Sequence, residues 1–200
     1  MFLKLGGRPC LVVGAGSVGE SKIEVLLSTD ASVRVVAPQA TQTVAEWART
    51  GRISWRQRSF ETGDLDGVFL VVVATSIREL NEHVYEQARR RSILCNVVDD
   101  PPHCDFYYPA VVRRGDLQIA VSTNGRSPAL AQRLRRELED HFGPEYEAWL
   151  KHLGQAREEL FRKPMDTEYR RELLHRMASR EGFEGFLKQA AGSEARKVVK

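Results

Sequence analysis

The sequence has few cysteines, no long apolar segment and no tract of low complexity. Its 200 residues include three cysteines, Cys10, Cys95 and Cys104, too few and too scattered for a disulfide framework. The longest apolar run, from Val68 to Ala74, is far shorter than the ~20 residues that span a bilayer. The N-terminal apolar run leads into a glycine loop and not a cleavage site, which argues against a signal peptide. We therefore expect a cytoplasmic protein with no membrane partner.

The charge balance gives little support for a nucleic-acid partner. Net charge is +3 at pH 7, with 42% apolar and 28% charged residues, which is ordinary for a folded globular chain. An arginine-rich stretch over 128–140 is interrupted by Glu137, Glu139 and Asp140 and has no aromatic residue for base stacking. We expect no nucleic-acid binding.

The first hundred residues alternate short apolar runs with segments of helical spacing. Such alternation predicts an α/β fold, a Rossmann-like parallel sheet covered by helices on both faces. Strands are expected over 10–14, 32–37, 53–58, 68–75 and 93–98, the second one stopped by Pro38, and helices over 18–28, 41–50 and 79–91.

The pattern changes after residue 99. Strands over 106–112 and 117–122 with a short connection predict a hairpin. Ser127 and Pro128 fit the N-cap and first turn of a helix that runs to about His141. Two further helices are expected over 146–161 and 167–179.

A glycine loop follows the first strand and opens the first helix. In the segment Gly14-Ala-Gly-Ser-Val-Gly19, Gly14 allows a tight turn, and Gly16 lets the backbone approach a pyrophosphate. Gly19 allows close packing of helix on strand. Phosphates then lie on the helix N-terminus. A structural turn without ligand is the alternative, and the strand–loop–helix context favours dinucleotide binding.

The acidic residue that usually binds the adenosine ribose ~20 positions later is missing. The second strand ends in Val-Val-Ala-Pro38-Gln39, so Gln39 or the backbone near Pro38 is left to contact the ribose. Arg34 is a candidate for a 2′-phosphate, but it lies inside the strand. These residues leave the choice between NAD and NADP open.

Asp99 is the first acidic group after the fifth strand, at the sheet edge where ligands of such folds bind. Two interpretations stay open: a proton-transferring carboxylate that faces the reactive end of a dinucleotide, or an aspartate, 99 or 100, that caps a turn before Pro101. Nearby His103, Cys104 and Asp105 offer too few ligands at zinc spacing. We therefore expect no dedicated metal site in the protein.

Five segments in order make the chain resemble a known family, the precorrin-2 dehydrogenase / sirohydrochlorin ferrochelatase family, which forms the N-terminal module of siroheme synthases. The resemblance covers residues 1 to about 145. The segments are Gly14–Gly19 with Lys22, Val35–Pro38, Ala74-Thr75 with Asn81, Cys95–Asp99 with Phe106 and Pro109, and Ala120–Ala129.

The resemblance implies an enzyme that oxidises precorrin-2 to sirohydrochlorin with NAD, and in some members inserts Fe²⁺ afterwards. Fe²⁺ or Co²⁺ would then be a substrate ion. It also implies a homodimer, built from an NAD-binding Rossmann domain over 1–108, a small α+β dimerisation region over 109–144 and a helical C-terminal region over 145–200. The alternative is a non-catalytic NAD-binding regulatory module, although such modules usually keep an acid after the second strand.

The resemblance also assigns residue roles. It makes Asp99 the general acid/base of both reactions and places Ser17, Val18, Pro38 and Gln39 against NAD. Thr75 and Asn96, which lie in matching segments, are added to the cofactor contacts with Gly14, Gly16 and Gly19.

The tetrapyrrole substrate carries many carboxylates, so its site should be cationic. Residues 109–136 hold six arginines against one acid, Asp116, and arginine binds carboxylates bidentately. At least two of Arg133, Arg135 and Arg136 are expected to form a solvated helix face paired with glutamates. The loop at the helix start is the better anion site, with Arg126 and Ser127 as its leading contacts. The substrate contacts we predict are Thr123, Asn124, Gly125, Arg126 and Ser127.

Overall fold

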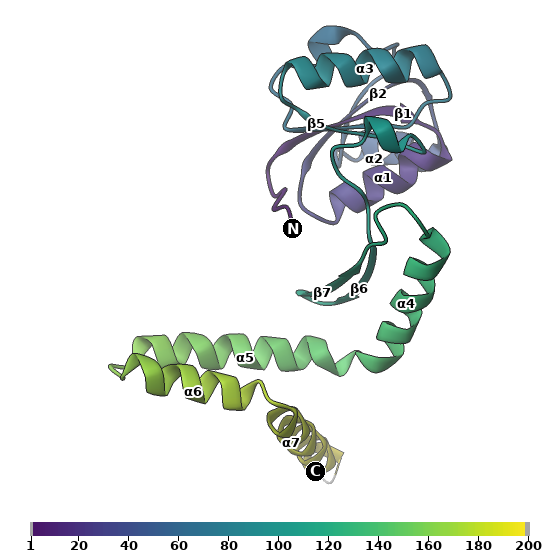
Figure 1. The fold of residues 1–200 in the computed structure, drawn as a ribbon. Helices are drawn as coiled ribbons and strands as arrows, with labels where there is room; N and C mark the ends of the chain where they lie inside the picture. Colours follow the sequence, from purple (N-terminus) through teal and green to yellow (C-terminus); the bar gives the residue numbers. More distant parts are fainter. Residues whose placement is uncertain (1, 199–200) are drawn as a thin grey trace. The chain divides into compact units, whose positions relative to one another are not determined.

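The computed structural model of the chain describes residues 2–198, with side chains for 2–190 and 192. The chain divides into two compact units. Unit 1 covers Met1–Tyr108 and unit 2 covers Pro109–Lys200, and both are drawn in Figure 1. Because their relative placement is not determined, each is described by itself.

Unit 1 is built on a five-stranded sheet in the order β3-β2-β1-β4-β5, with every neighbouring pair parallel. The chain adds β2 and β3 on one side of β1 and then returns to add β4 and β5 on the other, so the order reverses between β1 and β4. Ligands of doubly wound folds bind at that switch point. The Rossmann-like fold expected from the sequence is confirmed. The strands are β1 (Pro9–Ala15), β2 (Ser32–Ala40), β3 (Ser54–Arg56), β4 (Leu70–Val73) and β5 (Leu94–Val97).

Helices cover both faces of this sheet (Figure 1). Helices α1 (Ser17–Leu27) and α2 (Gln42–Arg49) share one buried apolar cluster with alternate strand residues such as Val12. Helix α3 (Arg78–Arg90) shares the other with residues such as Leu11. Burial on both faces explains why the strands are apolar without alternation.

Strand β2 is longer than expected, because it continues past Pro38 to Ala40. The pairing of β1 with β2 is irregular at this point: Val13 pairs with Val36, and Ala15 pairs with Ala40. Pro38 lies inside that irregularity, where no regular ladder hydrogen bond is required of it. The prediction that the strand stops before Pro38 is therefore wrong.

Unit 2 begins with the predicted hairpin, in which β6 (Ala110–Arg114) and β7 (Leu117–Val121) pair antiparallel. The first strand starts at Ala110 and not at Phe106, whose carbonyl instead accepts a hydrogen bond from the Asn96 amide within unit 1. Helix α4 (Pro128–His141) follows. Its predicted N-cap is confirmed, because the Ser127 hydroxyl accepts from the Leu130 N–H at 3.3 Å.

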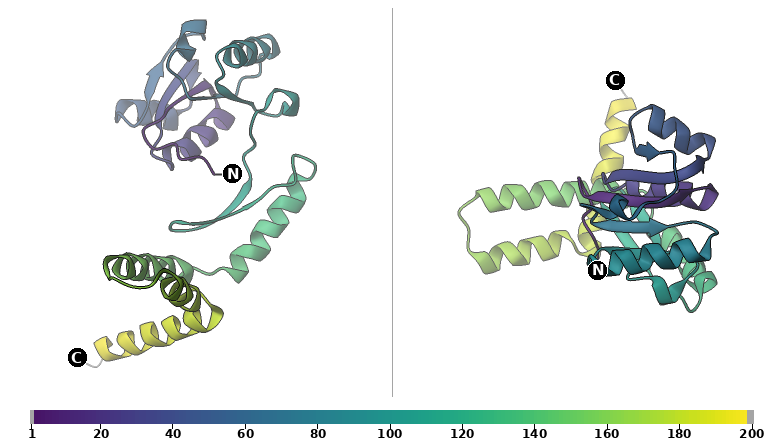
Figure 2. Two further views of the ribbon diagram at one scale, coloured as in Figure 1. Left: turned by 60° about the vertical axis from the view of Figure 1, so that its left-hand side comes forward. Right: turned by 90° about the horizontal axis from the view of Figure 1, so that it is seen from above.

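The C-terminal part of unit 2 is helical, as expected. It consists of α5 (Glu145–Arg162), α6 (Thr167–Met177) and α7 (Arg180–Val198), the last not predicted as a separate helix. Helices α5 and α6 run antiparallel (Figure 2), and neither contains a buried residue. Among the described residues, no helix has the length and apolar character needed to cross a bilayer. The cytoplasmic location stays a prediction.

Candidate active site

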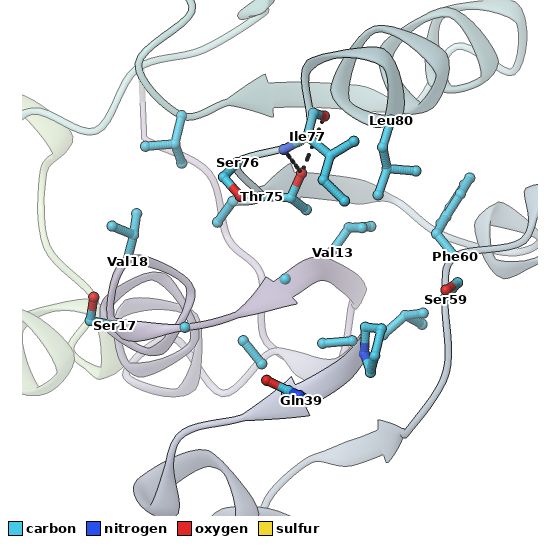
Figure 3. Close-up of a pocket in the computed structure, with 18 of the residues that line it drawn as sticks. Val13, Ser17, Val18, Gln39, Ser59, Phe60, Thr75, Ser76, Ile77 and Leu80 are labelled. Atoms are coloured by element: carbon cyan, nitrogen blue, oxygen red, sulfur yellow. Dashed lines mark hydrogen bonds between the residues drawn. The ribbon is translucent and has the colours of Figure 1, made fainter.

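Unit 1 has an open cleft of about 640 Å³ at the carboxyl ends of its strands. It lies at the topological switch point. Its walls come from the carboxyl ends of β1 and β2 and from the segments that follow β1, β3, β4 and β5 (Figure 3). The lining residues are Val13, Gly14, Ala15, Gly16, Ser17, Val18, Val36, Ala37, Pro38, Gln39, Ser59, Phe60, Ala74, Thr75, Ser76, Ile77, Leu80, Val98 and Asp99.

The glycine loop is packed tightly on one side and open on the other. Gly14 has φ +99°, and a Cβ there would lie 2.3 Å from the Ala74 carbonyl oxygen. A Cβ on Gly19 would lie 2.3 Å from the Gly14 carbonyl oxygen. Gly16 in contrast has no atom within 4 Å of a Cβ position, and it is the N-cap of α1 with no side chain capping the helix. The loop therefore fits a pyrophosphate, which would find free space and unpaired N–H groups there.

The ends of β2 and β3 form another wall. Pro38 and Gln39, both predicted as cofactor contacts, line the cleft together with Ser59 and Phe60. Figure 3 shows Gln39 and Ser59 on this side, with Thr75, Ser76 and Ile77 across from them. We did not predict Ser59 and Phe60, because they follow a short edge strand and carry no motif. The parallel order of β3 beside β2 is the signal that points to them.

Thr75 organises the turn from β4 into α3. Its hydroxyl donates to Asn81 Oδ1 at 2.5 Å and accepts from the Ile77 N–H at 3.1 Å. The Asn81 amide donates to the Thr75 carbonyl at 3.0 Å. This explains the joint occurrence of Thr75 and Asn81 in the matching segment: the pair fixes the shape of the cleft wall.

Asp99 follows β5, has φ +61° and is exposed to solvent. Asp99 is among the residues that line the cleft, and its carboxylate has no hydrogen-bond or ion-pair partner within the described residues. The neighbouring Asp100 is the N-cap residue of the short 3₁₀ helix Pro101–His103, and its carboxylate lies 2.7 Å from His103 Nδ1. The Asp100 carboxylate therefore pairs with His103 and makes no capping hydrogen bond to the turn, while that of Asp99 is left available to a ligand.

Two predicted cofactor residues do not line the cleft. Gly19 packs under the loop, and Asn96 is buried at the end of β5. The Asn96 amide donates to the Phe106 carbonyl at 2.8 Å and to Cys104 Sγ at 3.3 Å. Asn96 thus holds the segment after β5 in place from outside the cleft.

Two of the three thiols of unit 1, those of Cys10 and Cys95, are buried and unsuited to act as nucleophiles. Burial raises the pKa of Cys10 to about 11 and, more strongly than the nearby Asp105, raises that of Cys95 to about 12. A protonated, buried thiol is a packing group. Within the described residues, no group of three or more His, Cys, Asp or Glu side chains is arranged to hold a metal ion.

The predicted substrate loop lies in unit 2 and is internally ordered. The Thr123 hydroxyl accepts from the Ser127 N–H at 3.1 Å. Asn124 and Gly125 have φ +52° and +75°, the left-handed region that Asn and Gly adopt most readily. Arg126 at the tip of this turn is exposed and has no ion-pair partner among the side chains described, those of residues 2–190 and 192.

The six arginines near this loop differ in how they are engaged. Arg133 pairs with Glu137 at 3.4 Å and Arg135 pairs with Glu139, which confirms the expected paired helix face for two of them. Arg114 donates to the carbonyls of Phe142 and Glu139 at 2.8 and 3.0 Å, so it caps the end of α4. Arg113, Arg126 and Arg136 have no carboxylate partner in the described part of the chain.

Comparison with known proteins agrees with this geometry. Residues 1–110 match a family described as "Putative NAD(P)-binding", and residues 114–141 match one described as "Sirohaem biosynthesis protein central". Siroheme synthase 1 of Serratia proteamaculans is 41% identical over 139 residues, which are 70% of this chain and 29% of that protein. The siroheme synthase of Methylococcus capsulatus is 44% identical over the same length and share of each chain. The match therefore covers less than a third of these relatives' length.

A solved structure resembles nearly the whole chain. It is that of SirC, precorrin-2 dehydrogenase, with a TM-score of 0.77 and 29% identity over 94% of this chain and 96% of that chain. The family resemblance seen in the sequence is thus confirmed by the similar sequences and by the similar structure. Because the first family model covers more than half of the residues, the chain belongs to this "Putative NAD(P)-binding" family.

Proposed function

We propose that this chain is an NAD-dependent dehydrogenase that oxidises precorrin-2 to sirohydrochlorin. One observation carries the proposal: Asp99, exposed and without a side-chain partner among the described residues, lines the same cleft as residues 14–18 of the glycine loop. The similarity to SirC, a precorrin-2 dehydrogenase, supports the choice of substrate.

The cofactor would be held by residues that line the cleft. The N–H groups of the loop around Gly16, Ser17 and Val18 would bind the pyrophosphate, and Pro38 and Gln39 would contact the adenosine ribose. The uniformly uncharged wall on this side favours NAD over NADP. Bound NAD supplies the hydride acceptor, which no protein side chain provides.

Asp99 would move the proton. Oxidation of a tetrapyrrole carbon removes a proton together with a hydride, and a carboxylate within reach of the substrate accepts it. The left-handed backbone of Asp99 and its exposure keep this carboxylate clear of competing donors. In metal insertion, the pyrrole N–H protons would leave to the same group, with Fe²⁺ or Co²⁺ bound as substrate by the tetrapyrrole nitrogens.

The loop Thr123–Ser127 would bind substrate carboxylates. Arg126 supplies a guanidinium without a carboxylate partner among the described residues, on a turn shaped by Thr123 and Ser127. Arg113 and Arg136 add exposed cations to the same unit. Arginines that are spread over a surface can each bind one carboxylate of an anion that carries many carboxylates.

We also propose that the chain is a homodimer through unit 2. Helices α5 and α6 contain no buried residue, and Leu130, Phe161, Tyr169 and Leu187 are between 37% and 54% exposed. A second copy of unit 2 would bury these side chains. Sedimentation velocity at micromolar concentration tests this: a dimer is expected, and a monomer contradicts it.

The function is tested by mixing the full chain anaerobically with precorrin-2 and NAD⁺. The expected result is NADH formation matched by appearance of the sirohydrochlorin spectrum. Addition of Fe²⁺ or Co²⁺ to the same sample then reports metal insertion separately. Binding of NAD⁺ without any turnover of precorrin-2 would contradict the enzymatic function and indicate the regulatory module.

A further inference from the structure

A buried aspartate near the cleft, but outside its lining, binds three arginines, two through its carboxylate and one through its main-chain carbonyl. The Asp64 side chain has no exposed area and lies in a 3₁₀ turn, Thr62–Leu65. Its Oδ1 accepts from Arg56 Nη1 and Arg58 Nη2, both at 2.7 Å, and its Oδ2 accepts from Arg58 Nη1 at 2.8 Å. Arg34 Nη1 donates to the Asp64 carbonyl oxygen at 3.3 Å. Arg34, the residue of β2 considered above as a partner for a 2′-phosphate, therefore also binds Asp64.

Arg56 and Arg58 lie in and after β3, next to the wall of the cleft that Ser59 and Phe60 form. Arg58 directly precedes Ser59 and Phe60, which line the cleft and are labelled in Figure 3. Arg58 Nη1 also donates to the Ser59 carbonyl at 2.8 Å, and the Glu61 N–H donates to Asp64 Oδ2 at 2.9 Å. Asp64 therefore fixes the segment on both sides of the two lining residues.

The described residues that line the cleft include no positively charged side chain. In the part of the chain that the structure describes, the cleft lining contains no Arg, Lys or His, and Asp99 is its single charged residue. In Rossmann sites, an arginine near the end of the second strand accommodates the 2′-phosphate of NADP. Here the arginines of that region are already bound. Releasing one to a phosphate would weaken the pairing of a buried carboxylate, which is strongly unfavourable.

We propose that Asp64 is a specificity-determining residue, which makes the cleft select NAD⁺ over NADP⁺ by holding Arg56 and Arg58 away from the adenosine ribose. Asp64 touches no ligand and acts through the two guanidinium groups, so it is a positioning residue. The inference rests on one part of the proposed function, that the cleft binds a nicotinamide dinucleotide.

The test measures dissociation constants of the full chain for NAD⁺ and NADP⁺ by calorimetry. Wild type should bind NAD⁺ at least about tenfold more tightly. Asp64→Asn should reduce this ratio about tenfold by improving NADP⁺ binding, because one freed guanidinium gains a charge-assisted hydrogen bond to the phosphate. The matched control is Asp66→Asn, which removes the same charge from an exposed neighbour of the same turn and should leave the ratio unchanged.

A triple variant tests whether Asp64 acts through the two guanidinium groups. Asp64→Asn combined with Arg56→Gln and Arg58→Gln should return the ratio to that of wild type. Any general disturbance of Ser59 changes both affinities together, so the ratio separates selectivity from structural damage. An unchanged ratio in Asp64→Asn with a wild-type circular dichroism spectrum overturns the proposal.

Arg58→Gln alone keeps the test decisive if Asp64→Asn does not fold. Since Arg58 is held by Asp64, its removal should leave the ratio within about twofold of wild type. A tenfold loss of NADP⁺ affinity in this variant, or a wild-type preference for NADP⁺, overturns the proposal. A wild-type chain that binds neither dinucleotide contradicts the proposed function itself.

Discussion

Unit 1 and unit 2 bury very different amounts of apolar surface. In unit 1, strand residues such as Leu11 and Val72 have no exposed area, because helices cover both faces of the sheet. In unit 2, the buried apolar residues among those described are Ala110, Val112 and Ala131. Unit 1 therefore contains a complete core of its own, and unit 2 does not.

The interactions that hold unit 2 together are of another kind. Phe142, Tyr146, Trp149 and Phe183 form a chain of ring contacts, with centroids 4.6 to 5.6 Å apart. Partly exposed rings stabilise less than a sealed core. The difference teaches that the proposed dinucleotide site lies on the unit with the buried core, whereas the helical unit leaves apolar side chains partly exposed.

The largest effect is expected at Asp99. Asp99→Asn should lower turnover of precorrin-2 by at least about 100-fold, because general base catalysis contributes ~10²–10⁴-fold, while the dissociation constant for NAD⁺ changes less than about threefold. Steady-state kinetics and calorimetry check this. Asp30→Asn is the matched control, since Asp30 is also exposed and has a positive φ, 56°. Wild-type turnover in Asp99→Asn would remove Asp99 from the mechanism.

Gly16→Asp should abolish measurable NAD⁺ binding, with an affinity loss of about 100-fold or more. The new carboxylate enters the open space above the loop and repels the phosphates. The melting temperature should change little, because a Cβ at this position meets no atom within 4 Å. Gly154→Asp in unit 2, where a Cβ is equally free of contacts, should bind NAD⁺ normally. Normal binding by Gly16→Asp would show that the pyrophosphate lies elsewhere.

Leu11→Ala should reduce the free energy of unfolding of unit 1 by about 3 kcal/mol. Its side chain is completely buried in the sheet core, and such truncations cost ~2–5 kcal/mol. Urea unfolding followed by circular dichroism measures the change. A loss below about 1 kcal/mol would mean that unit 1 is packed no better than unit 2.

Asp64 should make unit 1 sensitive to acid. Burial alone would raise its pKa, but hydrogen bonds from Arg58, the Glu61 N–H and Arg56 outweigh burial and lower the pKa to about 2. Because the folded pKa lies below the unfolded value of about 3.9, the stabilisation is complete above pH ~4 and is lost as pH falls toward 2. It amounts to about 2.5 kcal/mol. Urea unfolding at several pH values measures the change. Between about pH 4 and pH 2 the free energy of unfolding should fall more steeply in wild type and Asp66→Asn than in Asp64→Asn.

The smallest effect on folding is expected in unit 2. Leu130→Ala, at a side chain that is 40% exposed, should cost the isolated chain less than about 1 kcal/mol, yet weaken self-association. Sedimentation velocity over a concentration series measures the second effect. A cost like that of Leu11→Ala, without any change in association, would contradict the view that a partner covers this surface.

The sequence predicted unit 1 better than unit 2 for a physical reason. Continuous apolar strands and the Gly14–Gly19 loop are local patterns, and they were sufficient to expect a parallel sheet with Asp99 at its ligand-binding edge. Ser59 and Phe60 reach the cleft through the order of the strands, which no local pattern encodes. Asn96 was expected at the cofactor, but a buried amide is drawn to whichever acceptors are near, here Phe106 and Cys104.

Helix α7 and the extension of β2 past Pro38 are two further features that local sequence patterns did not predict. Helix α7 has a weak apolar pattern, since Gly182, Gly185 and Gly192 interrupt it. Strand β2 passes Pro38 because its partner β1 is irregular at the glycine loop. Both outcomes depend on neighbours in space and not on the segment itself.

The most direct test of the central claim is a crystal structure of the full chain with NAD⁺. The account predicts the pyrophosphate within hydrogen-bond distance of the N–H groups that follow Gly16, the adenosine ribose beside Gln39, and the nicotinamide on the side of the Asp99 carboxylate. A dinucleotide bound in the opposite direction, with its adenine at Asp99, or bound outside this cleft, would contradict it.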